Sequence, residues 1–228
     1  MTDEQVVTFH LWRVRRTALP RALWHVAVDR WSLRRQPGLR FARLLGTASG
    51  FRPGDADPTR WAVVATWADD GAARAFETGS LVRRWDALSA ERWRARLTPV
   101  STRGRWSGRD PFGIVSEPTA GPVAALTRAR LNPLRTRRFR RAVPAVAADL
   151  QGRDGLRLAI GVGEWPIGLQ GTFSVWDSTA SLRAFAHDGA HREVVGRTPR
   201  EGWYAEELFT RFSVLRASGT VDGRVVFP

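Results

Sequence analysis

The chain has 228 residues, 43% of them hydrophobic and 25% charged, which is enough for one large or two small globular domains with a substantial core. No apolar run approaches the ~20 residues that a membrane-spanning helix requires, and the N-terminus lacks the pattern of a secretory signal. Cysteine is absent, so disulfides and thiolate metal sites are excluded, and we expect a cytoplasmic protein.

The formal net charge is +14, and all 36 basic residues are arginine. Such a charge raises the question of nucleic-acid or membrane binding. The densest basic stretch, residues 128–141, distributes its arginines around the predicted helix and lacks regularly spaced aromatic residues for base stacking. We therefore expect no nucleic-acid partner, while a peripheral contact with an anionic membrane surface stays open.

Taken in chain order, the first half alternates between strand and helix patterns. Residues 6–14 are β-branched or alternating and predict a strand, and residues 17–36 have the apolar spacing of a helix. Two further strands are expected, the second over residues 61–67, before a helix that Asp69 caps. A second helical segment around Trp93 is expected to lead into a closing strand.

The second half repeats this order, with a period of about 110 residues. Trp67 lies nine residues before Phe76, and Trp176 lies nine residues before Phe185. Four matches in the same order indicate an internal duplication. The matched segments are residues 38–46 with 155–163, 61–76 with 170–185, 90–100 with 200–215, and 104–112 with 219–227.

The duplication predicts the elements of the second half. We expect strands over 123–131 and 171–176, with a helix over 133–151 that Pro133 starts and Pro144 divides. Asp177 and Ser178 can cap the next helix, and a further helical segment is expected around Trp203.

The order βαββαβ is ferredoxin-like. Helices cover one face of such a sheet and leave the other bare, so two copies can bury their bare faces against each other. We therefore expect an α+β fold, in which a tandem duplication of a ferredoxin-like module forms a fused α+β barrel of the dimeric α+β barrel kind. Residues 1–112 would form the N-terminal module and residues 113–228 the C-terminal, cofactor-binding module. A homodimer is compatible with this arrangement but not required by it.

One histidine distinguishes the two halves. Alignment of the repeats sets His191 opposite Val82, and the helical spacing to Val195 directs His191 inward. An imidazole in an apolar pocket suits an iron ligand, and the alternative is a buried histidine that bonds a backbone carbonyl. His10 and His25 are expected to be structural.

Two neighbouring features give weaker indications. His187 and His191 are four residues apart, a spacing that can hold a non-haem metal, but Gly189 between them resembles a helix break. Glu164 ends a predicted strand, where a carboxylate can accept the distal N–H of an axial histidine. The alternative for Glu164 is an exposed loop side chain.

Three long, Trp-rich segments resemble the bacterial spheroidene monooxygenase family of carotenoid biosynthesis: residues 103–112, 161–178 and 201–212. The resemblance covers nearly the whole chain. It implies a haem-dependent monooxygenase that hydroxylates an acyclic carotenoid, or another hydrophobic natural-product intermediate, and can continue to a ketone. The arrangement is also similar to chlorite dismutases and aldoxime dehydratases, which bind haem through a histidine on a helix of the second module, and His191 is the matching position.

The resemblance implies haem b as the cofactor, dioxygen as the co-substrate and an electron donor such as ferredoxin. His191 would bind the iron, and arginines would pair with the propionates. A cofactor-free oxygenase, a haem-dependent lyase or dehydratase, and a non-catalytic peripheral membrane module are the alternatives. The side chains expected around the haem are Trp165, Phe173, Phe185, Val195 and Trp203, with Glu164 behind the iron ligand and Gln170 in the distal pocket.

Overall fold

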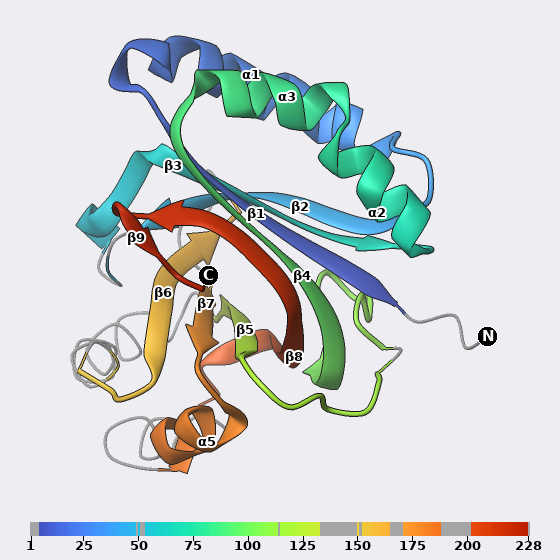
Figure 1. Ribbon diagram of the computed structural model, residues 1–228, viewed down its shortest axis with the longest axis vertical. Helices are drawn as coiled ribbons and strands as arrows, with labels where there is room; N and C mark the ends of the chain where they lie inside the picture. The colour runs from blue at the N-terminus through green and yellow to red at the C-terminus, as the bar shows by residue number, and fades with distance from the viewer. Residues whose placement is uncertain are drawn as a thin grey trace.

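The computed structural model describes residues 5–48, 50, 53–113, 115–132, 150, 152–164, 171–187 and 202–227. Within these residues, two sets of antiparallel strands meet at the centre of the molecule and helices lie outside them (Figure 1). No helix of this part of the chain has the length and apolar character needed to cross a membrane.

The first module has the ferredoxin-like strand order β4-β1-β3-β2, with every neighbouring pair antiparallel. Its helices α1 to α3 lie together on the outer face of the sheet (Figure 1). The elements are β1 (Val6–Val14), η1 (Arg16–Ala18), α1 (Leu19–Arg34), β2 (Leu39–Ala48), η2 (Pro53–Asp55), β3 (Ala56–Trp67), α2 (Asp70–Glu77), α3 (Ser80–Leu88) and β4 (Ser89–Gly104).

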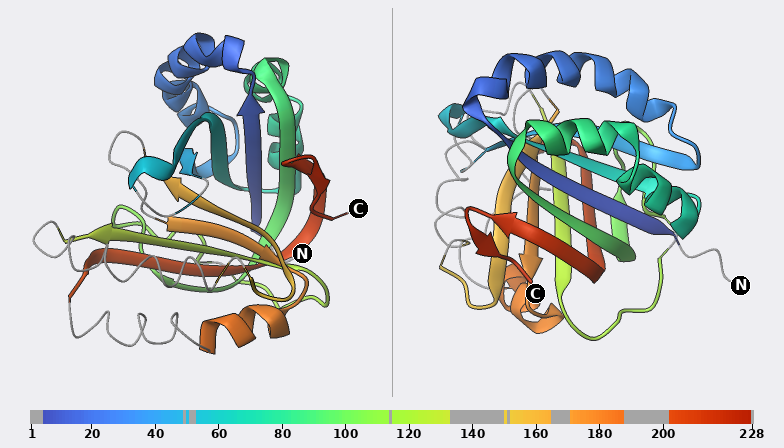
Figure 2. Two further views of the ribbon diagram at one scale, coloured as in Figure 1. Left: turned by 90° about the vertical axis from the view of Figure 1, so that its left-hand side faces the viewer. Right: turned by 45° about the horizontal axis from the view of Figure 1, so that its top comes forward.

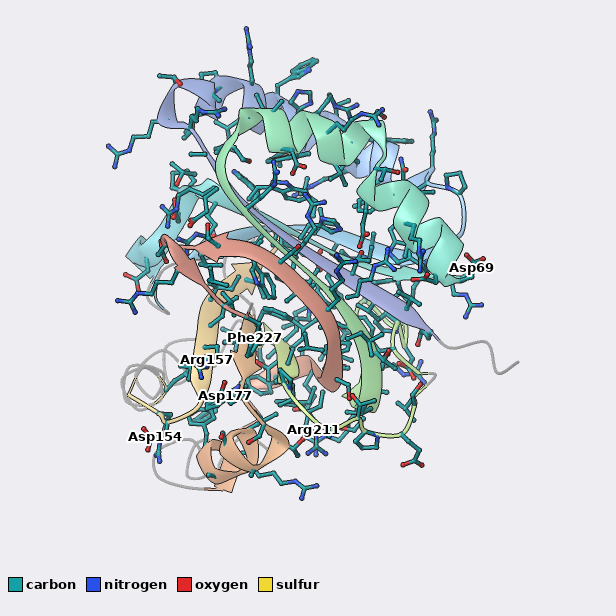
Figure 3. All side chains as sticks on the ribbon, viewed as in Figure 1. Asp69, Asp154, Arg157, Asp177, Arg211 and Phe227 are labelled. Atoms are coloured by element: carbon teal, nitrogen blue, oxygen red, sulfur yellow. The ribbon has the colours of Figure 1, made fainter. Side chains whose placement is uncertain are left out.

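The second module repeats that order as β6-β7-β5-β8. Its helix α5 begins after Ser178, whose hydroxyl accepts the N–H of Ser181, and Arg157 pairs with Asp177 beside it (Figure 3). The elements are β5 (Val123–Leu131), β6 (Leu156–Gly163), β7 (Gly171–Trp176), α5 (Thr179–His187), β8 (Tyr204–Val221) and β9 (Arg224–Val225).

Strands β1 to β8 close into a ring. Strand β2 pairs with β6 through Gly46 opposite Gly163, and β4 pairs along β8 from Trp93 opposite Gly219 to Gly104 opposite Leu208. Both junctions join corresponding strands of the two modules, so the ring has an approximate two-fold symmetry. The predicted fused α+β barrel is confirmed, and Figure 2 shows the helices of the two modules on opposite outer sides.

Side chains fill the interior of the ring. All of β1 to β8 contribute buried apolar residues to one continuous core. Phe9 and Phe173, from different modules, stack with ring centroids 3.8 Å apart, and Trp93 lies 6.2 Å and 6.1 Å from them. Because interiors pack to the density of organic crystals, this stack leaves little room for a large ligand at the centre of the ring.

The motif shared by residues 104–112 and 219–227 forms a reciprocal clamp between the modules. Residues 107–108 have φ values of 52° and 73°, and residues 222–223 have 53° and 73°. Glu206 accepts both N–H groups of the first turn at 2.9 and 2.8 Å, and Glu91 accepts both N–H groups of the second at 3.0 and 2.7 Å. Each module's last strand therefore holds the other module's turn, which explains why both copies keep the motif.

The helical segments expected around Trp93 and Trp203 are corrected by the structure. The helix ends at Leu88, Trp93 lies within β4, and Trp203 directly precedes β8. Residues 92–97 alternate arginine with an apolar residue, and this period of two is that of a strand with one buried face. The helix predicted over 133–151 lies almost entirely outside the described residues.

Candidate functional site

Four of the predicted site residues, Trp165, Gln170, His191 and Val195, lie outside the described part of the chain. The other predicted residues are placed on two different faces of the second sheet. Phe173 is fully buried inside the ring. Phe185 of α5 belongs to a separate apolar cluster between the second sheet and α5, which we call the outer core, and stacks there on Trp176 with ring centroids 5.4 Å apart. The structure therefore does not bring Phe173 and Phe185 together, because the sheet separates them.

Glu164 belongs to an ion network on the inner side of the junction between β2 and β6. Its carboxylate accepts the indole N–H of Trp106 and lies 3.5 Å from Arg43 Nε and 4.0 Å from an Arg128 nitrogen. Arg128 also pairs with the clamp residue Glu206. Burial lowers the pKa of Arg43, although the neighbouring Glu164 carboxylate opposes this effect. The observed contacts of Glu164 thus join the two modules, and its contact with His191 stays a prediction.

Trp203 is buried, with 1% of its surface exposed, and its carbonyl oxygen accepts the N–H of Asn132 at 2.8 Å. This bond fixes the start of β8 against the end of β5. A role for the Trp203 indole in holding a cofactor stays a prediction.

The helix-facing sides of the two sheets differ in side-chain size, and this contrast defines the candidate site. Strand pairing aligns the modules, because Val6 faces Trp67 and Val123 faces Trp176. In this register, large residues of the first sheet correspond to small residues of the second. Trp12 corresponds to Ala129, His10 to Thr127 and Leu44 to Gly161. Val63 corresponds to Thr172, which has a similar size but replaces a methyl group with a hydroxyl.

In the first module, the large side chains close the space between sheet and helices. Trp12, Leu44 and Val63 belong to one buried core with Val82 of α3. His10 is 1% exposed, stacks on Trp12 at 5.3 Å, and has its pKa lowered to about 3, chiefly by burial. The imidazole of His10 is therefore neutral and structural, as the sequence predicts.

We call the small residues of the second sheet, Thr127, Ala129, Gly161 and Thr172, the floor. The floor offers methyl, hydroxyl and backbone groups where the first module offers an indole and a leucine. Because protein interiors are close-packed, the released volume is filled by other chain segments or by a ligand. Trp176 and Phe185 of the outer core lie on the same side of the sheet and can form a wall beside the floor.

The floor was not predicted from the sequence, although the repeat itself shows the difference in side-chain size. Residues 38–46 and 155–163 match closely, yet Leu44 stands opposite Gly161. A comparison of side-chain size along the aligned strands would have identified the position.

Two other features do not form a comparable site. A cavity of about 270 Å³ opens beside β2 and residues 109–113. Its volume is below that usual for a pocket that holds a large cofactor. Gln5, Phe41 and Arg109 contribute to its lining. Among the described residues, no group of three or more His, Asp or Glu side chains is arranged to hold a metal ion. The pair His187 and His191 is not tested, because residue 191 is outside that part.

The closed ring of two ferredoxin-like modules defines the chain as a two-module α+β barrel protein. Solved aldoxime dehydratases share this fold. The superposition with one of them has a TM-score of 0.60 at 13% identity and covers 93% of this chain and 82% of the dehydratase chain. Another, aldoxime dehydratase (OxdRE) in complex with butyraldoxime, has a TM-score of 0.59 at 13% identity and covers 93% of this chain and 80% of its own.

No family model matches the sequence, but individual relatives establish its family. The chain is 34% identical over 215 residues to spheroidene monooxygenase of Rhodobacter capsulatus, and the alignment covers 91% of this chain and 89% of the relative. It is 37% identical over 194 residues to spheroidene monooxygenase of Rubrivivax gelatinosus, covering 83% and 74%. The chain therefore belongs to the spheroidene monooxygenase family and is a monooxygenase, an oxidoreductase.

Proposed function

We propose that the protein is a haem-dependent monooxygenase that hydroxylates an acyclic carotenoid or a similarly long hydrophobic molecule, and can carry the product on to a ketone. The relatives' name supports the substrate class. The contrast between the two helix-facing sheet surfaces supports the position of the cofactor, on the floor of the second module. Dioxygen as co-substrate and an electron donor such as ferredoxin are parts of the same proposal.

The side chains of the floor fit a flat apolar group. Val82, the counterpart of His191, is fully buried in the same core as Trp12, the counterpart of Ala129. By the approximate symmetry of the modules, we propose that position 191 lies on the same side of the second sheet as the floor. A side chain as large as Trp at position 129 would occupy the volume that a porphyrin needs.

In this proposal, His191 would supply the axial nitrogen, and Ala129 and Gly161 would allow close approach of the ring. The haem, when bound, supplies the dioxygen chemistry that no amino-acid side chain provides. The floor residues Thr127, Ala129, Gly161 and Thr172 carry no ionisable group. Their contribution in this proposal is orientation of the ligand and exclusion of water.

The absorption spectrum of the purified chain supplied with haem tests this proposal. We expect a Soret band in the wild type that His191→Ala abolishes or shifts. Ala129→Trp should also reduce haem binding, because it restores the first module's indole at the floor. Ala75→Trp, on the exposed side of α2, is the matched control and should bind haem normally.

Activity measurements separate the alternatives. A colourless protein that turns over the carotenoid at the full rate would contradict the haem proposal and favour a cofactor-free oxygenase. Haem binding with dehydration of an aldoxime, but no oxygen incorporation, would favour a haem-dependent lyase.

A further inference from the structure

Helix α1 (Leu19–Arg34) carries apolar residues on two opposite faces. Its inner face packs Ala22, Val26 and Leu33 against the first sheet. Its outer face exposes Leu23 (43%), Trp24 (68%), Val28 (42%) and Trp31 (65%). The described residues contain three other exposed large apolar side chains, Val115, Leu215 and Val225, so α1 holds most of this exposed surface.

We define the α1 outer face as Leu23, Trp24, Ala27, Val28 and Trp31. At about 100° per residue, these five positions cover an arc of roughly 140°, directly opposite the buried positions. The helix lies in the outermost layer of the molecule (Figure 1), so the outer face is directed away from the sheet. Exposed apolar surface of this extent on one helix is typical of an interaction site.

Arginines border the α1 outer face on both sides. In the same projection, Arg21 and Arg30 fall about 20° outside the two edges of this arc. Arg34 and the C-cap residue Arg35 fall about 20° inside the edges, at the C-terminal end of the helix. A wide apolar stripe with tryptophan, bordered by basic residues, is the pattern of a helix that lies in a membrane interface.

The acidic residue of α1 does not offset this charge. Asp29 is 1% exposed and lies on the inner face. It accepts the indole N–H of Trp85 at 2.9 Å and a guanidinium N–H of Arg84 at 2.6 Å. The helix therefore contributes only positive charge to the surface, in a chain whose net charge is already +14.

Charge decides between a bilayer and a second copy of the chain as the partner. Two copies that met through this helix across a two-fold axis would set the bordering arginines of one copy near those of the other. An anionic bilayer instead offers phosphates to the arginines and an apolar interior to the side chains between them. Indole rings prefer the level of the headgroups, where their apolar bodies are buried and their N–H groups stay hydrated.

We propose that the α1 outer face docks the protein on an anionic phospholipid bilayer, with Trp24 and Trp31 in the headgroup region and the bordering arginines on lipid phosphates. This inference concerns the first module and does not rest on the proposed cofactor or substrate. Its test therefore needs neither haem nor turnover.

Co-sedimentation of the full-length protein with vesicles tests the proposal. Vesicles of phosphatidylcholine with phosphatidylglycerol should bind the protein, and vesicles of phosphatidylcholine alone should bind it far less. Trp24→Ser/Trp31→Ser should weaken binding at least tenfold. Arg21→Glu/Arg35→Glu should weaken it at least about 25-fold, since each of the two arginines near an anionic surface contributes about a factor of five. Leu215→Ser/Val225→Ser, which changes exposed apolar residues elsewhere, is the matched control and should bind like the wild type.

Thermal unfolding of each variant verifies that the fold is retained, as expected for exposed positions. Binding that falls steeply with added salt, and is lost in the α1 variants but not in the control, supports the proposal. Equal binding by the tryptophan variant and the control overturns it. The proposal is also overturned if the wild type does not bind anionic vesicles but forms a dimer, and Trp24→Ser/Trp31→Ser dissociates that dimer.

Discussion

Protonation of His10 should limit the stability of this protein in mild acid. The His10 ring is buried between Trp12 and Phe76. It stacks on Trp12 with ring centroids 5.3 Å apart and meets Phe76 edge to face with centroids 5.4 Å apart. No described residue forms a hydrogen bond with its Nε2. Burial, followed by the positive charges of Arg94 and Arg96, lowers its pKa from 6.5 to about 3.

The sign and size of the effect follow from this depressed pKa. Below pH 6.5 the unfolded chain binds a proton at position 10 that the folded chain does not bind until about pH 3. Stability is therefore full above pH 6.5 and falls as the pH drops toward 3, by about 1.4 kcal/mol per pH unit. At pH 5 the loss is about 2 kcal/mol, which is a large part of a typical net stability.

Urea unfolding of the wild type and His10→Leu at several pH values between 7 and 4.5 measures this contribution. The variant lacks the titrating group but keeps an apolar side chain of similar size, so other ionisable groups cancel in the difference. We expect the wild type to lose about 2 kcal/mol more than His10→Leu between pH 7 and pH 5. Parallel stability curves for the two proteins would refute a neutral, buried His10.

Variants at three further positions test other parts of the architecture by chemical denaturation. Glu91→Ala should cost about 1–3 kcal/mol, because turn N–H groups lose their acceptor. Burial raises the pKa of Glu91, but its hydrogen bonds outweigh this and hold the pKa below the ordinary value of 4.5, so the contribution should begin to fall as the pH drops through 4.5 and be lost below the folded-state pKa. The same loss of stability in acid for Glu91→Ala and the wild type would contradict this. Phe173→Ala should cost about 3–5 kcal/mol by opening a cavity against Phe9, and a cost under 1 kcal/mol would mean a looser ring interior. Asp69→Ala should cost about 1 kcal/mol through loss of the cap on α2, whereas Asp69→Ser should retain most of it.

The strands were predictable because their signals are local. The predicted segments 6–14, 123–131 and 171–176 coincide with strands of the structure, since alternation of apolar residues reports a half-buried strand directly. The segment around Trp93 was predicted wrongly because alternating arginine and apolar residues were interpreted as part of a helix. The arginines lie on the outer face of β4, where Arg96, for example, forms ion pairs with Glu77 and Asp70. The alternation of outward arginines with inward apolar residues is the pattern of a strand.

The candidate site was less predictable than the fold. Phe173 and Phe185 both lie near the repeated motif, and the sequence gives no sign that the sheet separates them. Glu164 was expected behind an iron ligand, and its observed partners, Trp106 and Arg43, both belong to the N-terminal module. They are 58 and 121 positions away in the sequence, and contacts between such distant residues depend on how the ring closes.

The sequence by itself determined the duplication, the strand order within each copy and the family, because these depend on local periodicity and on residue identity. The tertiary structure alone decided which face of the second sheet is available to a ligand. Alternation shows that a strand has two faces, but not which face another module will cover. Closure of the ring through the junctions β2–β6 and β4–β8 buries the inner faces around Phe9 and Phe173, so the small residues on the outer face, Ala129 and Gly161 among them, form the candidate site.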